Sequence, residues 1–199
     1  MTITELRNNL SGPSEEYRAK QLHAVPSGTV VNRESFILER VKGKVVLDIG
    51  ASGRMHEAIV RAAKRCYGID KPNRSDVLLG PDTFGVDLNS EPGGIPKLDD
   101  VEVIVCGEVI EHLSNPGNFI DALWSFYECP VIITVPNAFS DVGRRSMETG
   151  IENVNLEHVA YYSYWTLREL VTRHGYKITE SHWYNGRPMF SEGLIFVVE

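Results

Sequence analysis

The chain has 199 residues, 42% of them hydrophobic and 24% charged, which fits one globular domain with a sizeable core. Its formal net charge of −7 argues against binding nucleic acid through overall charge, so no nucleic-acid partner is expected. No apolar run is long enough to span a bilayer, and the N-terminus lacks the basic start and apolar stretch of a signal peptide.

The first 43 residues are predicted to form a helical segment that packs on the domain, and residues 44–199 to form the domain itself. Residues 13–24 are typical of one short helix that begins at a proline or serine. A second helix is predicted over residues 33–41, because Phe36, Ile37 and Arg40 recur at helical spacing.

Strands and helices then alternate. Residues 44–49 are apolar on both faces, as expected of a central parallel strand. Further strands are predicted within 66–70, 82–88, 101–107 and 129–137, with helices over 56–65 and 115–128. Residues 138–160 are polar without a clear period, and loops of that length in a compact domain are usually functional or mobile.

The last part of the chain predicts a helix followed by two strands. The helix begins after Ser163 as N-cap and ends before Gly175. The strands lie within 176–184 and 193–199, with a hairpin-like turn at Asn185 and Gly186. The pattern predicts a doubly wound α/β fold, with a seven-stranded, mostly parallel sheet that contains one antiparallel strand.

Acidic and small residues follow several of the predicted strands. Ligands of such sheets bind beyond the carboxyl ends of the strands. Asp70 comes 22 residues after Asp48, and an acid about 20 residues beyond a glycine turn is placed to bind ribose hydroxyls. Asp87 and Glu108 end the next two strands, and Gly50 lets the backbone come close to a ligand.

The glycine turn departs from the dinucleotide pattern G-x-G-x-x-G. Ser52 stands where the second glycine would be, and Met55 takes the place of the third. A pyrophosphate would be poorly bound by such a turn, and the acids at the strand ends also disfavour phosphate. A ligand that carries adenosine without phosphate fits better.

Six stretches together resemble the class I S-adenosylmethionine-dependent methyltransferases. They are VVLDIGASGRM, YGID, GVDL, GEVIEHLSNPGNF, ITVPN and NLEHVAYYSYWTLRELVTRHGY. The resemblance runs from about Lys44 to the C-terminus and is closest to small-molecule methyltransferases, and its most specific part is GEVIEHLSNP. It implies a Rossmann-like fold, S-adenosylmethionine as cofactor and methyl transfer to a small-molecule acceptor. The family usually has glycine where this chain has Ser52 and Arg54.

The resemblance also implies roles for nine cofactor-binding residues. Asp70 would bind the ribose hydroxyls, and Asp87 and Leu88 would hold the adenine. The residues expected around the methionine part and the sulfur are Asp48, Gly50, Ser52, Cys106, Gly107 and Glu108.

His112 and His158 are the candidates for proton transfer, with a structural hydrogen-bonding role as the alternative for each. Glu111 is a further candidate base, and Tyr161 and Tyr162 are candidate contacts of the acceptor. The spacing of Glu108, Glu111 and His112 resembles that of metal ligands. Because neither H-E-x-x-H nor H-x-x-E-H is present, no metal is expected.

Two alternatives remain at this point. Ser52 and Arg54 raise the possibility of a non-catalytic methyltransferase-like binding or scaffold protein. A nicotinamide-dependent oxidoreductase is disfavoured by the incomplete glycine pattern. Three widely spaced cysteines without a C-x-x-C motif indicate reduced thiols and a cytoplasmic protein. The sequence does not name the acceptor and leaves the oligomeric state open.

Overall fold

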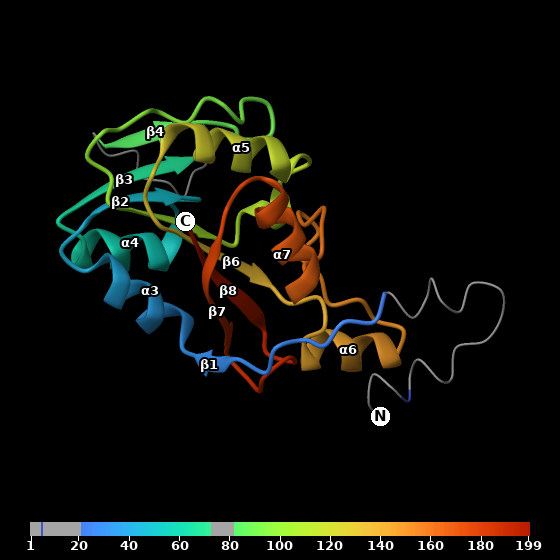
Figure 1. The fold of residues 1–199 in the computed structure, drawn as a ribbon. Coiled ribbons are helices and arrows are strands. Elements are labelled where there is room, and N and C mark those ends of the chain that lie inside the picture. The colour runs from blue at the N-terminus through green and yellow to red at the C-terminus, as the bar shows by residue number, and fades with distance from the viewer. Residues whose placement is uncertain (1–4, 6–20, 73–81) are drawn as a thin grey trace.

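The computed structural model describes residue 5 and residues 21–72 and 82–199. One sheet runs through the molecule, with helices on both of its faces (Figure 1). The strands are β1 (Thr29–Val31), β2 (Val45–Ile49), β3 (Arg65–Asp70), β4 (Thr83–Gly85), β5 (Val103–Gly107), β6 (Val131–Pro136), β7 (Ile178–Tyr184) and β8 (Gly193–Val198). The helices are α3 (Arg33–Val41), α4 (Gly53–Ala62), the 3-10 helix η1 (Ile110–His112), α5 (Pro116–Phe126), α6 (Asp141–Glu148) and α7 (Tyr164–Arg173).

The strand order is β1-β7-β8-β6-β5-β2-β3-β4. All neighbours pair in parallel except β8, which is antiparallel to both β6 and β7. This confirms the doubly wound, mostly parallel sheet with one antiparallel strand. The described sheet has eight strands rather than seven, because residues 29–31 pair with β7 as an edge strand.

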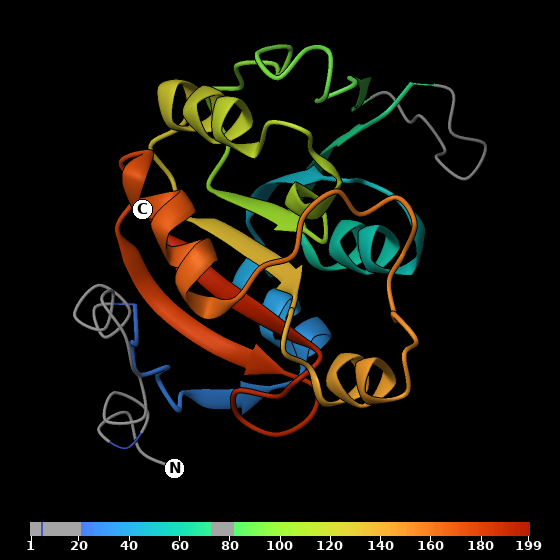
Figure 2. The same cartoon turned by 90° about the vertical axis from the view of Figure 1, so that its right-hand side faces the viewer.

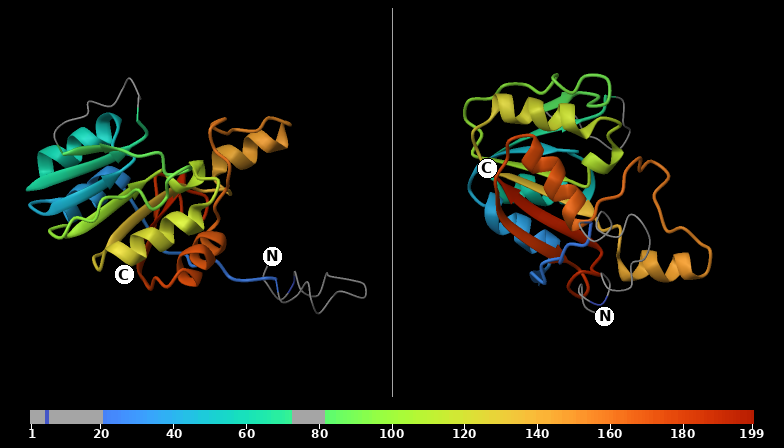
Figure 3. Two further views of the ribbon diagram at one scale, coloured as in Figure 1. Left: turned by 90° about the horizontal axis from the view of Figure 1, so that it is seen from above. Right: turned by 45° about the vertical axis from the view of Figure 1, so that its right-hand side comes forward.

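The sheet has helices on both of its faces (Figures 1 and 3) and separates two apolar cores. Successive side chains of a strand point to opposite faces, so Leu47 and Ile49 of β2 join the core under α5 and α7, whereas Val46 joins the core under α3 and α4. Each fully buried side chain of this size contributes about 1.5–3 kcal/mol of stability. The central strands are therefore apolar on both faces, as the sequence predicts.

The N-terminal segment differs in part from its predicted helical structure. The helix expected over 33–41 is confirmed, and the side chain of Asn32 caps it by accepting a hydrogen bond from the Ser35 N–H at 2.9 Å. Residues 29–31 form a strand instead, because β7 offers them a free edge to pair with. Most of the helix predicted over 13–24 lies outside the described residues.

The expected loop over 138–160 contains a helix that the sequence pattern did not indicate. Ser140 caps α6 and accepts a hydrogen bond from the Gly143 N–H at 3.1 Å. No residue of α6 is buried, and its two large apolar side chains, Val142 and Met147, are five residues apart rather than three or four, so they do not form the pattern of a core-facing helix. The chain between α6 and α7 then passes beside the carboxyl ends of β5 and β6 (Figure 2).

The predicted cap of α7 and the predicted turn residues are confirmed. Ser163 caps α7 in a capping box with Thr166, and Gly175 just beyond the helix has a φ of +95°. Asn185 and Gly186 both have positive φ in the turn after β7. All three cysteines are free thiols. None of the helices in the described ranges has the length and apolar character needed to cross a membrane.

Candidate functional site

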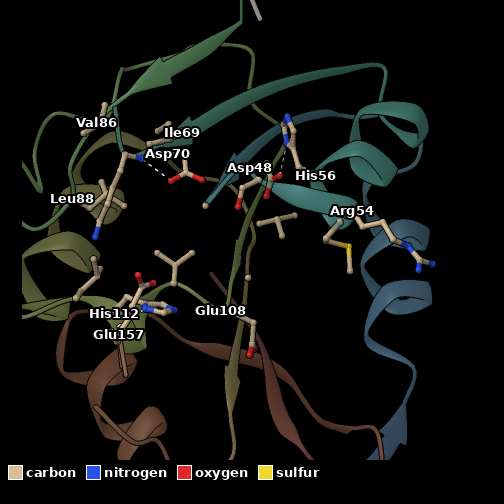
Figure 4. A pocket seen from close by; sticks show the side chains of 18 of the residues that line it. Asp48, Arg54, His56, Ile69, Asp70, Val86, Leu88, Glu108, His112 and Glu157 are labelled. Atoms are coloured by element: carbon tan, nitrogen blue, oxygen red, sulfur yellow. Dashed lines mark hydrogen bonds and ion pairs between the residues drawn. The ribbon is translucent and has the colours of Figure 1, made fainter. Parts of the chain in front are cut away.

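The carboxyl ends of β2, β3 and β5 border a cavity of about 440 Å³ (Figure 4). Its size is in the range of small-molecule and cofactor sites. The residues that line it are Arg33, Asp48, Gly50, Ser52, Arg54, Met55, His56, Ile69, Asp70, Lys71, Val86, Leu88, Val105, Gly107, Glu108, Val109, His112, Leu113, Asn155 and Glu157.

The turn after β2 forms one wall of the cavity. Gly50 has a φ of +79°, and a Cβ added there would lie 2.6 Å from Cγ2 of Val109, so the position needs glycine on both counts. The N–H groups of Gly50 and Ala51 donate to the Ile69 carbonyl at 2.8 and 2.9 Å, which fixes the turn against β3. Ser52 is the N-cap of α4, but its side chain makes no capping hydrogen bond.

Arg54 does not close the cavity. Its side chain is exposed and extends away from Asp48 and Asp70 in Figure 4. The residue that replaces a family glycine therefore leaves the space above the turn open.

Two buried carboxylates, those of Asp48 and Asp70, lie near each other at the strand ends that border the cavity (Figure 4). Asp48 Oδ2 lies 2.7 Å from Nδ1 of His56, and Asp70 Oδ1 accepts a hydrogen bond from the Lys71 N–H at 2.6 Å. Burial raises the pKa of Asp48, an effect that the hydrogen bond with His56 opposes. Beside these polar groups, the apolar side chains of Ile69, Val86, Leu88 and Leu113 form the other wall.

Glu108 follows β5 directly and connects that strand to β6 and β7 at the floor of the cavity. Its Oε1 accepts hydrogen bonds from the hydroxyls of Tyr184, at 2.7 Å, and Thr134, at 3.1 Å. Arg33 of α3 donates from Nε to Thr134 Oγ1 at 3.0 Å and itself lines the cavity. No sequence motif indicated Arg33 as a cavity residue, because its position depends on how α3 packs against the sheet.

Replacing Tyr184 with phenylalanine is expected to lower the free energy of unfolding by about 1.5–3 kcal/mol, because the hydroxyl hydrogen-bonds a carboxylate in a part-buried setting. Urea titration followed by circular dichroism measures the change. Tyr161→Phe is the matched control: this exposed hydroxyl also hydrogen-bonds a carboxylate, Glu152, and its loss should change stability by less than about 0.5 kcal/mol. Equal losses in the two variants would contradict the assignment.

A second cavity, of about 660 Å³, adjoins the first beneath α6 and the chain that follows it. Asn155 lines both cavities, while His112 lines the first and His158 the second. The two imidazole rings meet edge to face, with 4.6 Å between their centroids. Burial lowers the pKa of His158, and neighbouring His112 lowers it further.

Glu111 of η1 lies beside these histidines and is almost fully buried. Burial raises the pKa of its carboxyl to about 8, and the neighbouring Glu108 carboxylate contributes to the rise. Of the two tyrosines predicted to contact an acceptor, Tyr161 lines the second cavity. Tyr162 is buried in the core, and its hydroxyl lies 3.5 Å from the Ile110 carbonyl oxygen.

Seven of the nine residues predicted to bind a cofactor line the first cavity: Asp48, Gly50, Ser52, Asp70, Leu88, Gly107 and Glu108. Two do not. Cys106 is fully buried in the core below, because its side chain points to the α5 face of the sheet. Asp87 accepts a hydrogen bond from the Asn89 N–H at 3.0 Å and stabilises the turn after β4. The cavity is also lined by residues that no sequence motif indicated, among them His56, Lys71, Val86, Asn155 and Glu157.

Comparisons with known proteins agree with this geometry. A family model described as a methyltransferase domain matches residues 19–181. No curated protein matches the sequence at a significant level.

Three solved structures share the fold. The small RNA methyltransferase HEN1 has a TM-score of 0.66 at 19% identity over 84% of this chain, which spans only 24% of the HEN1 chain. A SAM-dependent methyltransferase from Aquifex aeolicus has a TM-score of 0.60 at 16% identity, with all of both chains covered. Magnesium protoporphyrin IX methyltransferase (ChlM) from Synechocystis PCC 6803, solved with bound SAH, has a TM-score of 0.60 at 13% identity over 99% of each chain.

The match to the family model covers most of the chain, and the doubly wound sheet with its glycine turn and strand-end acids is the architecture that the sequence resemblance implies. The chain therefore belongs to the S-adenosylmethionine-dependent methyltransferase domain family.

Proposed function

We propose that the enzyme transfers the methyl group of S-adenosylmethionine to a small-molecule acceptor. The observation that carries the proposal is the pair of adjoining cavities, which meet at His112 and His158. The cavity at the strand ends would hold the cofactor, and the cavity beneath α6 would hold the acceptor. Residues 44–199 would form the catalytic domain and residues 1–43 an N-terminal segment packed on it, in a cytoplasmic protein.

The residues of the first cavity suit the cofactor. The buried Asp70 carboxylate is an acceptor for ribose hydroxyls, and Ile69, Val86 and Leu88 offer an apolar surface to the adenine. Gly50 and Ser52 leave room for the methionine part beside the turn, where a side chain at position 50 would collide with Val109. Asp48 and Glu108 supply negative charge for a positively charged ligand.

The chain's own contribution to the reaction is alignment. The cofactor supplies an activated methyl group on a positively charged sulfur, so the protein chiefly has to orient the nucleophile toward it. His112 and His158 lie where the two cavities meet, and each is a candidate to hold the acceptor or to accept its proton. Asp87 and Cys106, which do not line the cavity, stay predictions from the family resemblance.

The second cavity favours a small acceptor over a nucleic acid. It contains the apolar side chains of Val142 and Met147 and the carboxylates of Glu152 and Glu192, and neither lysine nor arginine is among its lining residues in the described part of the chain. A phosphate backbone would need basic partners there. HEN1 is a small RNA methyltransferase, but this chain spans only 24% of it.

Calorimetric titration with S-adenosylhomocysteine tests the cofactor part of the proposal. Binding to a single site, followed by methyl transfer to members of an acceptor panel, would support it. The alternative of a non-catalytic scaffold predicts no transfer to any acceptor despite a folded protein. Absence of heat at millimolar ligand, together with an unchanged melting temperature, would contradict cofactor binding.

Asp70→Ala is expected to weaken binding of S-adenosylhomocysteine by about 1–3 kcal/mol, because the variant loses the acceptor for the ribose hydroxyls. The same titration measures the change. Asp99→Ala removes an exposed carboxylate outside the cavity and should bind as the parent does. Unchanged affinity in Asp70→Ala would show that the ribose lies elsewhere.

A further inference from the structure

The carboxyl group of Glu111 is unusual for a buried acid. Glu111 is 1% exposed, and neither of its carboxylate oxygens has a hydrogen-bond partner among the described residues. Burying a polar group without a partner costs several kcal/mol, so such groups are normally hydrogen-bonded, paired with a charge or bound to a metal. The Glu111 carboxylate therefore needs a binding partner that the described residues do not supply.

Two histidines lie beside this carboxylate. Ligand atoms of Glu111, His112 and His158 all lie within 4.8 Å of one another. The main chain holds the group together, because the N–H groups of Val159 and Ala160 both donate to the Glu111 carbonyl, at 2.8 and 3.2 Å. Residues that are far apart in the sequence are thus fixed around one point.

The hydrogen bond of His112 prepares its ring for a ligand. Nδ1 lies 3.2 Å from the carbonyl oxygen of Glu157, and because a carbonyl can only accept, Nδ1 must carry the proton. The neutral ring then has its lone pair on Nε2. Metal-binding histidines typically donate their other ring N–H to such a carbonyl, which fixes the tautomer and the orientation of the ring.

We propose that Glu111, His112 and His158 bind one divalent first-row transition-metal ion. Two imidazoles and one carboxylate suit ions such as Mn²⁺ or Zn²⁺ better than Ca²⁺ or Mg²⁺, which prefer oxygen ligands throughout. Ligand atoms about 2.1 Å from one ion lie up to roughly 4 Å apart, so small side-chain rotations bring the three residues onto it. The sequence predicts no metal, because it contains neither H-E-x-x-H nor H-x-x-E-H. The third residue of this set, His158, lies far from Glu111 and His112 in the sequence, so no short motif contains all three.

A second group of three potential metal ligands is formed by Asp48, His56 and Cys66, and we propose no metal site there. Asp48 Oδ2 is already engaged with Nδ1 of His56 at 2.7 Å. Burial raises the pKa of the Cys66 thiol to about 12, and this group contains no buried nitrogen or oxygen atom that lacks a partner among the described residues.

The ion would also define the acceptor, a consequence that rests on the proposed function. Three protein ligands leave coordination positions open, and the site lies between the cofactor cavity and the cavity beneath α6. An alcohol or phenol fits these positions, because a bound cation lowers the pKa of a hydroxyl. The hydroxyl would release its proton to solvent, and its oxygen would form the new bond to the methyl carbon. The electrons of the broken carbon–sulfur bond would stay on sulfur.

Mn²⁺ titration of the chelator-treated 199-residue chain, followed by electron paramagnetic resonance of the free ion, tests the metal site. One bound Mn²⁺ per chain is expected, with at least about 100-fold weaker binding in Glu111→Gln and in His158→Asn. His174→Asn is the matched control, because His174 hydrogen-bonds Asp121 and belongs to neither group of potential ligands. It should bind Mn²⁺ as the parent does.

Thermal unfolding of each variant shows whether it is folded. If Glu111→Gln fails to fold, His158→Asn still shows whether the proposed residues bind Mn²⁺. No binding by the parent at millimolar Mn²⁺, or undiminished binding by either folded ligand variant, would overturn the proposal. Titration with S-adenosylhomocysteine is run separately on the parent chain. If that ligand fails to bind while Mn²⁺ binds, the proposed function is lost and the metal site stands.

Discussion

Gly50→Ala is expected to weaken binding of S-adenosylhomocysteine at least about tenfold, equivalent to ~1.4 kcal/mol, and to destabilise the fold as well. The added Cβ would lie 2.6 Å from Cγ2 of Val109, on a residue whose φ is +79°. Holding alanine in this region costs about 1–2 kcal/mol, and forcing a methyl group into a packed position costs about 1–3 kcal/mol more. Val109 is β-branched and buried, so it has little freedom to move aside.

Gly53→Ala separates the backbone cost of a positive φ from the steric cost of the added methyl group. Gly53 also has a positive φ, of +64°, but a Cβ there would meet nothing within 4 Å. The control should therefore show the backbone cost alone. Isothermal calorimetry and urea unfolding of both variants measure the difference. Equal effects of the two substitutions would mean that the close approach to Val109 has no part in shaping the cavity.

Phe196→Ala is expected to lower the free energy of unfolding by about 3–5 kcal/mol, because truncating a buried aromatic leaves a cavity that its neighbours fill only in part. Phe196 is fully buried in β8, the antiparallel strand between β6 and β7. Its ring packs edge to face on Tyr164 of α7 with 5.2 Å between centroids, so the loss loosens a helix from the sheet.

The melting temperature reports this effect directly. In a domain of this size each kcal/mol corresponds to about 2–4 °C, so a fall of roughly 6–20 °C is expected. Val60→Ala, at a half-exposed position of α4, is the control and should change stability by less than about 0.5 kcal/mol. A fall of only one or two degrees in Phe196→Ala would show that this part of the core repacks easily.

Several residues of the cavity could be predicted from local sequence pattern, because they lie at the ends of predicted strands. Asp48, Gly50, Asp70 and Glu108 were identified from their order after apolar runs, and all four line the cavity. The carboxyl ends of parallel strands share one edge of a sheet, so knowing the strands was enough to bring these residues together. Cys106 does not line the cavity, because successive residues of a strand face opposite sides and its side chain points into the core.

The sequence by itself determined the type of most elements, the mostly parallel sheet and the cofactor edge, because hydrophobic period, caps and turn residues act over a few neighbouring positions. Only the tertiary structure placed Arg33 over the floor of the cavity, added β1 to the sheet edge and brought His158 to Glu111 and His112. The physical reason is that these contacts join segments whose separation along the chain is large. Their meeting depends on how helices and loops pack, which no local pattern encodes.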